Sequence, residues 1–215
     1  MTRVLHIITR LDVGGSAENT VLSATRLPAA EFACSLISGL TEDPAPGMAQ
    51  AIQAARIPWF ELPCLRREVH LGLDAQALLQ LTARIRRLRP GIVHTHSSKA
   101  GFLGRVAARL AGVQHMVHTP HGHVFDGYFS PRRTRAFIAL ERWAARFTER
   151  IVTLTDAEAA QHLAVGIGRP EQFVTIPSGV DLEPVLQATP IRLAPGRPVI
   201  GTVARLVPVK GIEHL

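Results

Sequence analysis

Short apolar runs alternate with longer segments of helical periodicity along most of the chain. Seven runs rich in β-branched residues, most of them bounded by Gly, Pro or polar turns, predict strands at Val4–Thr9, Phe32–Ser38, Ile57–Leu62, Ile92–Thr95, His115–Thr119, Arg150–Leu154 and Phe173–Ile176. Amphipathic segments between them predict helices near 17–27, 47–56, 74–89, 99–111, 131–148 and 156–165. Such alternation favours parallel pairing with right-handed crossovers, so we expect an α/β fold with a doubly wound parallel sheet. Ligands then belong at the carboxyl ends of the strands.

The last part of the chain reads differently. Residues 184–198 hold four prolines and a glycine and resist both helix and strand, as an interdomain linker does. We therefore predict one lobe over 1–184, a linker over 185–197, and the beginning of a second lobe over 198–215, with a strand at Pro198–Val203. Eighteen residues cannot build a second core.

Composition narrows the class of protein. With 47% hydrophobic and 19% charged residues over 215 positions, the chain can bury enough surface to fold, which excludes global disorder. The formal charge of +7 favours anionic partners such as nucleotide phosphates, acidic lipid headgroups or nucleic acid. Nucleic acid is not expected, because aromatic residues are only 5% and no nucleic-acid-binding signature occurs.

The cysteines and the N-terminal residues indicate in which cellular compartment the protein is expected. Cys34 and Cys64 are the two cysteines and form no CxxC pair, which argues against a disulfide scaffold or structural zinc and fits a reducing cytoplasm. The first sixteen residues have no signal-peptide core or cleavage site, and no stretch approaches eighteen apolar residues. We expect a protein that is neither exported nor membrane-spanning.

The first predicted strand leads into a glycine pair at Gly14-Gly15, just before a helix. Two glycines let a ligand approach the backbone closely while helix N–H groups point at an anion, which describes a phosphate cradle. A simple tight turn explains the pair equally well. It is not a dinucleotide fingerprint, because GxGxxG is absent and the second strand ends in Ser38 rather than an acidic residue.

Six of the ten histidines fall between positions 94 and 123, at the ends of two strands that a doubly wound sheet places centrally. No Asp, Glu or Cys occurs from 92 to 125, so we expect no metal site. His94 and His96 share one strand face and are interpreted as core groups. His121 follows a strand terminus, where its ring can hydrogen-bond a ligand hydroxyl.

Two further segments permit more than one interpretation. Ser97, Ser98 and Lys99 lie where a strand turns into a helix, so the serines can cap the helix or, with Lys99, attract an anion. The helix beginning at residue 131 has apolar residues on one side and arginines on the other. This pattern fits a helix packed on the sheet under a solvated face, and it also fits contact with anionic lipid.

Several segments taken together resemble the family-4 glycosyltransferases of GT-B fold. They are VGGSAENT, HTHSSKAGFLGRVAA, VHTPHGHVFDGYF, IVTLTDAE, IPSGVD and GTVARLVPVKG. The resemblance implies two Rossmann-like lobes, of which the N-terminal lobe presents the acceptor and the C-terminal lobe holds a nucleotide-diphosphate sugar. It also implies transfer with retention of anomeric configuration and without a metal or other cofactor.

Carried over residue by residue, the resemblance implies that Arg205 and Lys210 bind the donor diphosphate. Gly14 and Gly15 would bring backbone N–H groups to the same diphosphate from the opposite lobe. His121 would contact the transferred sugar and orient it. Ser98 and Lys99 would lie nearer the acceptor.

The family's donor lobe carries two glutamates separated by seven residues, and this sequence has none at the corresponding place. Glu141 and Glu149 have that spacing, but they lie in the first lobe, where we interpret them as surface ion-pair partners of little energetic weight.

The resemblance predicts a glycosyltransferase of surface polysaccharide or glycolipid synthesis. The expected partners are a nucleotide sugar, a glycan or lipid-linked acceptor, and an anionic membrane surface to which the cytoplasmic protein binds peripherally. The 215 residues alone are expected to be inactive. Two alternatives stay open: a lobe that binds a glycan or nucleotide without turnover, and a sugar-nucleotide epimerase of the same fold.

Overall fold

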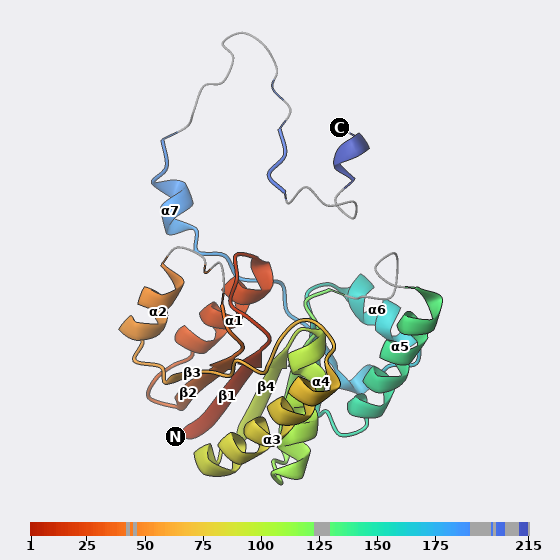
Figure 1. Ribbon diagram of the computed structural model, residues 1–215. Helices are drawn as coiled ribbons and strands as arrows, with labels where there is room; N and C mark the ends of the chain where they lie inside the picture. Colours follow the sequence, from red (N-terminus) through yellow and green to blue (C-terminus); the bar gives the residue numbers. More distant parts are fainter. Residues whose placement is uncertain are drawn as a thin grey trace. The chain divides into compact units, whose positions relative to one another are not determined.

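The computed structural model describes residues 1–41, 44, 47–122, 130–189, 199, 201–204 and 211–214 (Figure 1). The strands are β1 (Thr2–Ile8), β2 (Phe32–Ser38), β3 (Trp59–Glu61), β4 (Ile92–His96), β5 (His115–Thr119), β6 (Arg150–Thr153) and β7 (Phe173–Thr175). The helices are α1 (Gly15–Thr25), α2 (Met48–Ala54), α3 (Leu71–Leu88), α4 (Ser98–Leu110), α5 (Pro131–Ala145), α6 (Asp156–Ala164) and α7 (Glu183–Leu186). Short 3-10 turns occur at Pro170–Gln172 and Ile212–His214.

All seven strands form one parallel sheet in the order β3-β2-β1-β4-β5-β6-β7. The chain moves outward from β1 to β3, returns to β4 beside β1, and then moves outward in the other direction. The predicted doubly wound α/β sheet is thus confirmed. From the β1–β4 boundary the chain therefore leads outward in opposite directions, to β2 on one side and to β5 on the other. The register places His6 of β1 directly beside His94 of β4 across this boundary.

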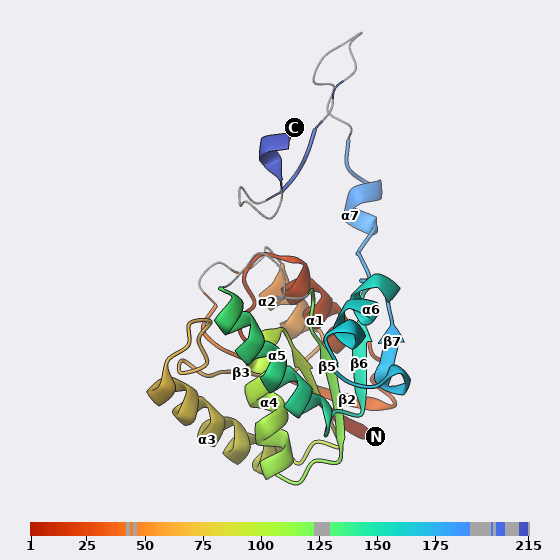
Figure 2. The ribbon, with the colours of Figure 1, turned by 90° about the vertical axis from the view of Figure 1, so that its right-hand side faces the viewer.

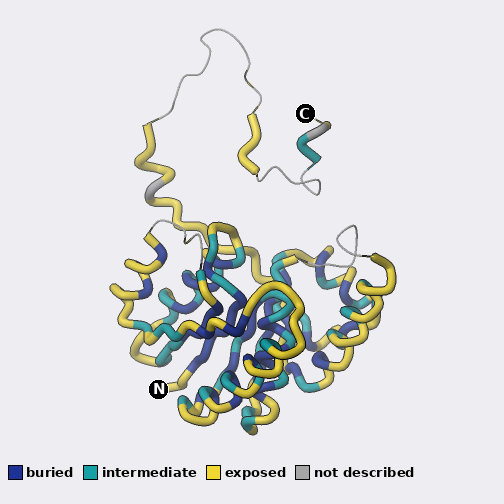
Figure 3. Tube along the Cα trace, in the orientation of Figure 1, coloured by how far each residue is buried: buried dark blue, intermediate teal, exposed yellow. Residues whose placement is uncertain are grey.

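One face of the sheet is covered by α3 and α4. Leu5, Ile7 and Val93 from β1 and β4 are fully buried against these helices, and the cluster includes Ala77 of α3 and Ala107 of α4 (Figures 1 and 3). Alternate side chains of a strand point to opposite faces, so the residues between these apolar positions face the other side. This face holds the larger part of the hydrophobic core.

The opposite face is covered over only part of its width. Helices α1 and α2 pack against Ile8 and Leu36, which lie on β1 and β2. At the outer edge of this face, Val174 on β7 and Ile176 just after it are 40% and 52% exposed. The β1–β4 boundary therefore lies where helix cover on this face ends.

Helix α4 approaches the sheet closely because Gly101 has no side chain. A Cβ atom added at Gly101 would lie 2.4 Å from Cε1 of His118 on β5. Farther along α4, the fully buried Arg105 forms an ion pair of 2.6 Å with Glu141 of α5. Arg105 also donates to the Gly101 carbonyl oxygen at 2.8 Å, so its buried charge is neutralised and hydrogen-bonded.

That ion pair corrects the interpretation of Glu141 as a surface residue. Its partner Arg105 comes from α4, and a pairing between two helices in space leaves no periodic signal in the sequence of α5. Glu149 does behave as expected, because it pairs with His115 at 2.7 Å while both side chains are about half exposed.

Helix α5 ends at Ala145, three residues earlier than predicted, and Figure 2 shows it beside α6 at the β5–β7 side of the sheet. The chain then turns into β6. Gln172 donates hydrogen bonds to the carbonyl oxygens of Ala145 and Thr148, and these bonds hold the turn in place of further helix.

The chain divides into two units, Met1–Gly179 and Val180–Leu215. The predicted division at residue 184 stays a prediction, and most of the predicted linker lies outside the described residues. The predicted strand at Pro198–Val203 is wrong for its described positions: Val199 and residues 201–203 form no strand. A strand requires a hydrogen-bonded neighbour, and no described residue pairs with this segment.

Two expectations about compartment can be compared with the described residues. Cys34 and Cys64 are both free thiols. No helix in the described part of the chain is long and apolar enough to cross a bilayer.

Candidate functional site

The candidate site lies at the carboxyl ends of β1, β4 and β5. A doubly wound sheet binds ligands at this edge where the strand order reverses, which here is between β1 and β4. The segments that follow these strands carry Gly14 and Gly15, Ser98 and Lys99, and His121, respectively. The structure therefore brings the sequence-predicted residues of this lobe to one edge.

Helix α1 begins without a side-chain cap. Gly14 is its N-cap residue with a positive φ of 155°, a conformation that favours glycine, and no side chain in the described part of the chain caps the first turn. Apart from the chain neighbours, no atom of a described residue lies within 4 Å of a Cβ built on Gly14 or Gly15. The open backbone can accommodate an anion at the helix N-terminus, and the assignment of these glycines to a diphosphate stays a prediction.

Helix α4 begins differently from what capping predicts. Ser97 is the N-cap residue with φ of 58°, yet its side chain does not cap the helix, and its hydroxyl donates to the His96 carbonyl oxygen at 2.6 Å. The ammonium group of Lys99 contacts the Asp74 carboxylate at 2.5 Å and also donates to the Glu68 carbonyl oxygen. Lys99 is thus fixed by α3 and the segment before it.

His121 sits in a strained turn that is held from its far side. Its φ is 59°, in the left-handed region that is uncommon for residues other than glycine. The buried carboxylate of Glu158 on α6 accepts hydrogen bonds from the backbone N–H groups of Gly122 at 2.9 Å and Leu154 at 2.8 Å. Glu158 therefore ties the β5 turn to the end of β6.

A row of imidazole rings connects this turn to the interior of the sheet. Nδ1 of His6 lies 3.1 Å from Nε2 of His96, and Nδ1 of His96 lies 3.0 Å from Nε2 of His121. The ring of His94 lies 4.1 Å from that of His96, centroid to centroid, and its Nε2 is 2.8 Å from the hydroxyl oxygen of Thr119. His94 and His96 occupy one face of β4, as predicted.

Burial makes these rings neutral. Desolvation lowers the pKa of His6 to about 4, and it lowers the pKa of His94 and His96 well below 6.5, with repulsion among the rings adding to the effect. Desolvation also lowers the pKa of His121 to about 4, against the opposing influence of the Glu158 carboxylate. At neutral pH the rings exchange hydrogen bonds as uncharged donors and acceptors.

The same rings form the one group of potential metal ligands among the residues described. Nitrogen atoms of His6, His94 and His96 lie within 4.8 Å of one another. Imidazole nitrogen suits zinc, but no carboxylate belongs to the group, and the hydrogen bonds already use both nitrogens of His96. The expectation that the protein needs no metal stays a prediction.

Sequence reasoning missed two residues of this site. His6 interrupts an otherwise apolar strand, and the order β1-β4 would have placed it beside His94, but adjacency of these strands is not visible in the sequence. Glu158 stands three residues after Thr155, whose hydroxyl accepts from the Glu158 N–H at 3.1 Å. This Thr-x-x-Glu spacing indicates a helix start, so the sequence gives no sign that Glu158 also binds the backbone of the His121 turn.

Arg205 and Lys210, which the resemblance assigns to the donor diphosphate, lie outside the described residues. Their role stays a prediction.

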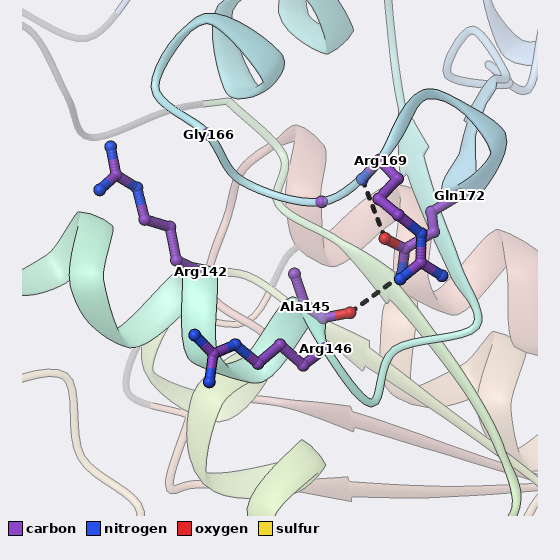
Figure 4. Close-up of a pocket in the computed structure, with 7 residues that line it drawn as sticks. Arg142, Ala145, Arg146, Gly166, Arg169 and Gln172 are labelled. Carbon is purple, nitrogen blue, oxygen red and sulfur yellow. Dashed lines mark hydrogen bonds between the residues drawn. The ribbon is translucent and has the colours of Figure 1, made fainter.

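A second hollow lies at the opposite edge of the sheet, between the end of α5 and the loop before β7. It has a volume of about 220 Å³, is open to solvent, and is lined by residues that include Arg142, Arg146 and Arg169 (Figure 4). Figure 4 shows the side chains of Arg142 and Arg146 leaving α5 in different directions while Arg169 comes from the loop across from them. Because these guanidinium groups do not converge, the C-terminal edge remains the candidate site.

A parallel sheet of this order, with an open glycine turn and polar side chains at its reversal point, defines a Rossmann-like lobe. Residues 14–179 match the family model described as a glycosyl transferase 4-like domain. The chain belongs to this family, and the resemblance to family-4 glycosyltransferases is confirmed.

Two curated relatives carry names of glycosyltransferases. The chain is 39% identical to UDP-Gal:alpha-D-GlcNAc-diphosphoundecaprenol alpha-1,3-galactosyltransferase of Escherichia coli, over 58% of this chain and 32% of the relative. It is 31% identical to 2-deoxystreptamine glucosyltransferase of Streptomyces kanamyceticus, over 74% of this chain and 47% of the relative. The matches thus span about a third to a half of these relatives.

Solved structures share the fold at low sequence identity. A glycosyltransferase from Rickettsia africae superposes with a TM-score of 0.62 at 16% identity, over 88% of this chain and 47% of the other. A UDP-N-acetylglucosamine 2-epimerase gives a TM-score of 0.58 at 16% identity, over 81% and 48%. At this identity the likeness shows the fold alone, and the fold does not separate transferase from epimerase.

Proposed function

We propose that the chain is the acceptor-side lobe of a glycosyltransferase that moves a sugar from a nucleotide-diphosphate sugar to a glycan or lipid-linked acceptor. The observation that carries this proposal is the 39% identity to an enzyme named for a UDP-sugar donor and a diphosphate-linked lipid acceptor. We further propose retention of anomeric configuration, a cytoplasmic location and a role in surface polysaccharide or glycolipid synthesis.

The residues at the C-terminal edge supply binding and orientation. The uncapped start of α1 at Gly14 and Gly15 offers backbone N–H groups to the donor diphosphate. His121 orients the transferred sugar from a turn that Glu158 holds in place. Arg205 and Lys210 would stabilise the charge that develops on the leaving diphosphate, and the proposed reaction uses no metal.

Lys99 and Ser98 would serve the acceptor side. The ammonium group of Lys99 has three N–H donors, and its contacts with Asp74 and the Glu68 carbonyl oxygen use two of them. One donor remains for an acceptor oxygen. A lysine fixed in this way supports positioning of the acceptor better than a freely moving one.

Helix α5 supports peripheral binding to an anionic membrane. Leu140 and Trp143 are each 42% exposed, so packing on the protein covers their apolar surface only in part. Arginines follow the neighbouring face at positions 132, 135, 142 and 146. An exposed Trp and Leu beside a basic stripe matches helices that lie at a lipid interface.

The membrane proposal is tested by sedimentation with phosphatidylglycerol vesicles at low salt. Replacing Arg132, Arg135 and Arg146 by Gln should weaken binding by about 3 kcal/mol, or roughly 100-fold, at about 1 kcal/mol per arginine. Replacing Arg84, Arg86 and Arg87 of α3 by Gln removes the same charge elsewhere and is the matched control. Equal losses in the two variants would contradict a specific role for α5.

The catalytic proposal is tested with the product of the complete open reading frame. The purified protein is incubated with UDP-galactose, UDP-glucose or UDP-N-acetylglucosamine and a lipid-diphosphate-linked N-acetylglucosamine acceptor. Mass spectrometry of the lipid detects transfer, and the anomeric proton coupling of the product reports retention. His121→Ala should lose transfer, whereas His115→Ala, which changes an exposed histidine at the other edge, should keep it.

Three outcomes separate the proposal from its alternatives. A glycosylated lipid supports the transferase. An epimerised nucleotide sugar without transfer identifies an epimerase. Saturable acceptor binding with neither reaction identifies a binding lobe.

A further inference from the structure

The contacts of His6, His96 and His121 form one continuous chain of rings from the interior of the sheet to the candidate site. His6 is 1% exposed and His96 fully buried, whereas His121 is the half-buried outer member. Both links pair Nδ1 of the inner ring with Nε2 of the next outer ring, at 3.1 Å and 3.0 Å. The ring of His94 lies beside this chain, tilted against those of His6 and His96, but its hydrogen bond is with Thr119. We call the three linked rings the histidine row.

Each link of the histidine row needs a single proton between its two nitrogens. A neutral imidazole carries one N–H and one bare nitrogen, and burial keeps these rings neutral at pH 7 by lowering their pKa. Two bare nitrogens at 3.0 or 3.1 Å would repel each other, and two N–H groups would clash. All three rings must therefore point their protons in the same direction along the row.

The inner end of the row decides between the two directions. Nε2 of His6 is buried and has no hydrogen-bond partner among the residues described. If the protons pointed inward, this atom would be an N–H donor without an acceptor. If they point outward, it is only a bare acceptor. Buried orphan donors are the rarer and costlier case, so the outward direction is favoured.

We propose that His96, anchored by His6, is a positioning residue that fixes His121 in the tautomer with its proton on Nδ1. Each ring of the histidine row then carries its proton on Nδ1, although free histidine in water favours Nε2. His121 presents an N–H donor to an acceptor oxygen of the sugar nucleotide. This last step rests on the proposed function, but the tautomer itself does not.

The surroundings of His121 support this assignment. Its Nε2 is hydrogen-bonded to His96. Its Nδ1 has no hydrogen-bond partner among the described residues, and this atom is not completely buried. Glu158 fixes the turn through the backbone N–H of Gly122 rather than through the ring. The Nδ1 position is thus left for a ligand.

The direct test is a long-range ¹⁵N–¹H correlation spectrum of the ¹⁵N-histidine-labelled chain near pH 7.5. A protonated ring nitrogen and a bare one resonate far apart, so each ring reports its tautomer without any substrate. We expect Nδ1 protonated and Nε2 bare in His6, His96 and His121. A proton on Nε2 of His121 would overturn the proposal, whatever reaction the protein catalyses.

A variant tests whether His96 is the cause. His96→Phe keeps a ring of similar shape but removes both nitrogens, so His121 should change to the Nε2-protonated form that free histidine favours. His118→Asn is the matched control, because His118 is equally buried but bonds to Thr95 outside the row. If a folded His96→Phe protein keeps the Nδ1 proton, another group sets the tautomer. If the variant does not fold, the wild-type spectrum still decides.

Two further readouts complete the design. The spectrum is recorded with chelator and with added zinc; loss of the ring N–H pattern on chelation would show a metal site instead of the histidine row.

In the transfer assay, His121→Asn places an amide N–H near the Nδ1 position, whereas His121→Gln reaches toward Nε2. Asn should retain at least tenfold more activity than Gln, and the reverse order would overturn the donor role of Nδ1.

Discussion

At the β1–β4 boundary, the same two strands present apolar side chains on one face of the sheet and histidines on the other. Toward α3 and α4 the strands present Leu5, Ile7 and Val93, all fully buried in apolar contacts. Toward the other face they present His6, His94 and His96. The first face stabilises the fold. The second accepts buried polar groups where helix cover ends, which is costly unless they bind one another.

Acid should have the largest effect, because burial lowers the pKa of four rings on the histidine face, whereas Leu5, Ile7 and Val93 on the apolar face do not titrate. The pKa of His6 and of His121 is about 4 when folded, against 6.5 when unfolded. Between pH 6.5 and 4 the unfolded chain binds the extra protons, so the free energy of unfolding falls as pH falls. The slope is about 1.4 kcal/mol per pH unit for each histidine, or about 5 kcal/mol for the pair from pH 6.5 to 4.5.

Urea unfolding at a series of pH values measures this dependence. His6→Phe should flatten the slope by about one histidine's share, whereas Ile7→Val on the apolar face should shift the whole curve by about 0.5–1.5 kcal/mol without changing its slope. Stability that does not change between pH 6.5 and 4.5 would show that the folded protein binds as many protons as the unfolded chain, so that burial does not lower the pKa of these rings.

Breaking the Arg105–Glu141 pair should have the next largest effect. Glu141→Ala leaves the guanidinium of Arg105 buried without its counterion and should lower the free energy of unfolding by about 3–5 kcal/mol. Glu149→Ala removes a carboxylate from an exposed pair with His115 and should cost at most about 1 kcal/mol. If the two variants had similar urea unfolding midpoints, the guanidinium group of Arg105 would have to be solvated by water once Glu141 is removed.

Substitutions at two glycines, one on the packed face and one at the open edge, should have smaller effects on stability. Gly101→Ala pushes a methyl group into His118 and should cost about 1–3 kcal/mol. The added methyl group of Gly15→Ala meets no atom of the described residues within 4 Å beyond its chain neighbours, and this change should alter stability by less than about 0.5 kcal/mol. Thermal unfolding distinguishes them, and a destabilised Gly15→Ala would show that the α1 turn is a packed turn rather than an open cradle.

Periodicity predicted all seven strands and six helices because local burial patterns repeat along the sequence. Helix ends were predicted less accurately where tertiary contacts decide them. At Ala145 the carbonyl oxygen accepts a hydrogen bond from the Gln172 side chain, and the α-helix does not continue. The strand predicted at Pro198–Val203 failed for its described residues because a strand requires a partner as well as a propensity.

The candidate site was predictable in its residue types but not in its connections. The histidine cluster and the glycine turn are local features of the sequence. That His6 joins the cluster, and that Glu158 holds the turn of His121, follow from strand order and from contacts between distant segments. Lys99 shows the same limit, since its pairing with Asp74 arises between two helices.

The most direct test measures transfer and stability together in the His121→Ala variant of the complete open reading frame. We expect a loss of about 100-fold in transfer rate, the typical consequence of losing a positioning contact, while the free energy of unfolding changes by no more than about 1.5 kcal/mol. An unchanged rate, or a loss of rate that only follows a loss of folded protein, would contradict the assignment of this edge as the sugar-binding site.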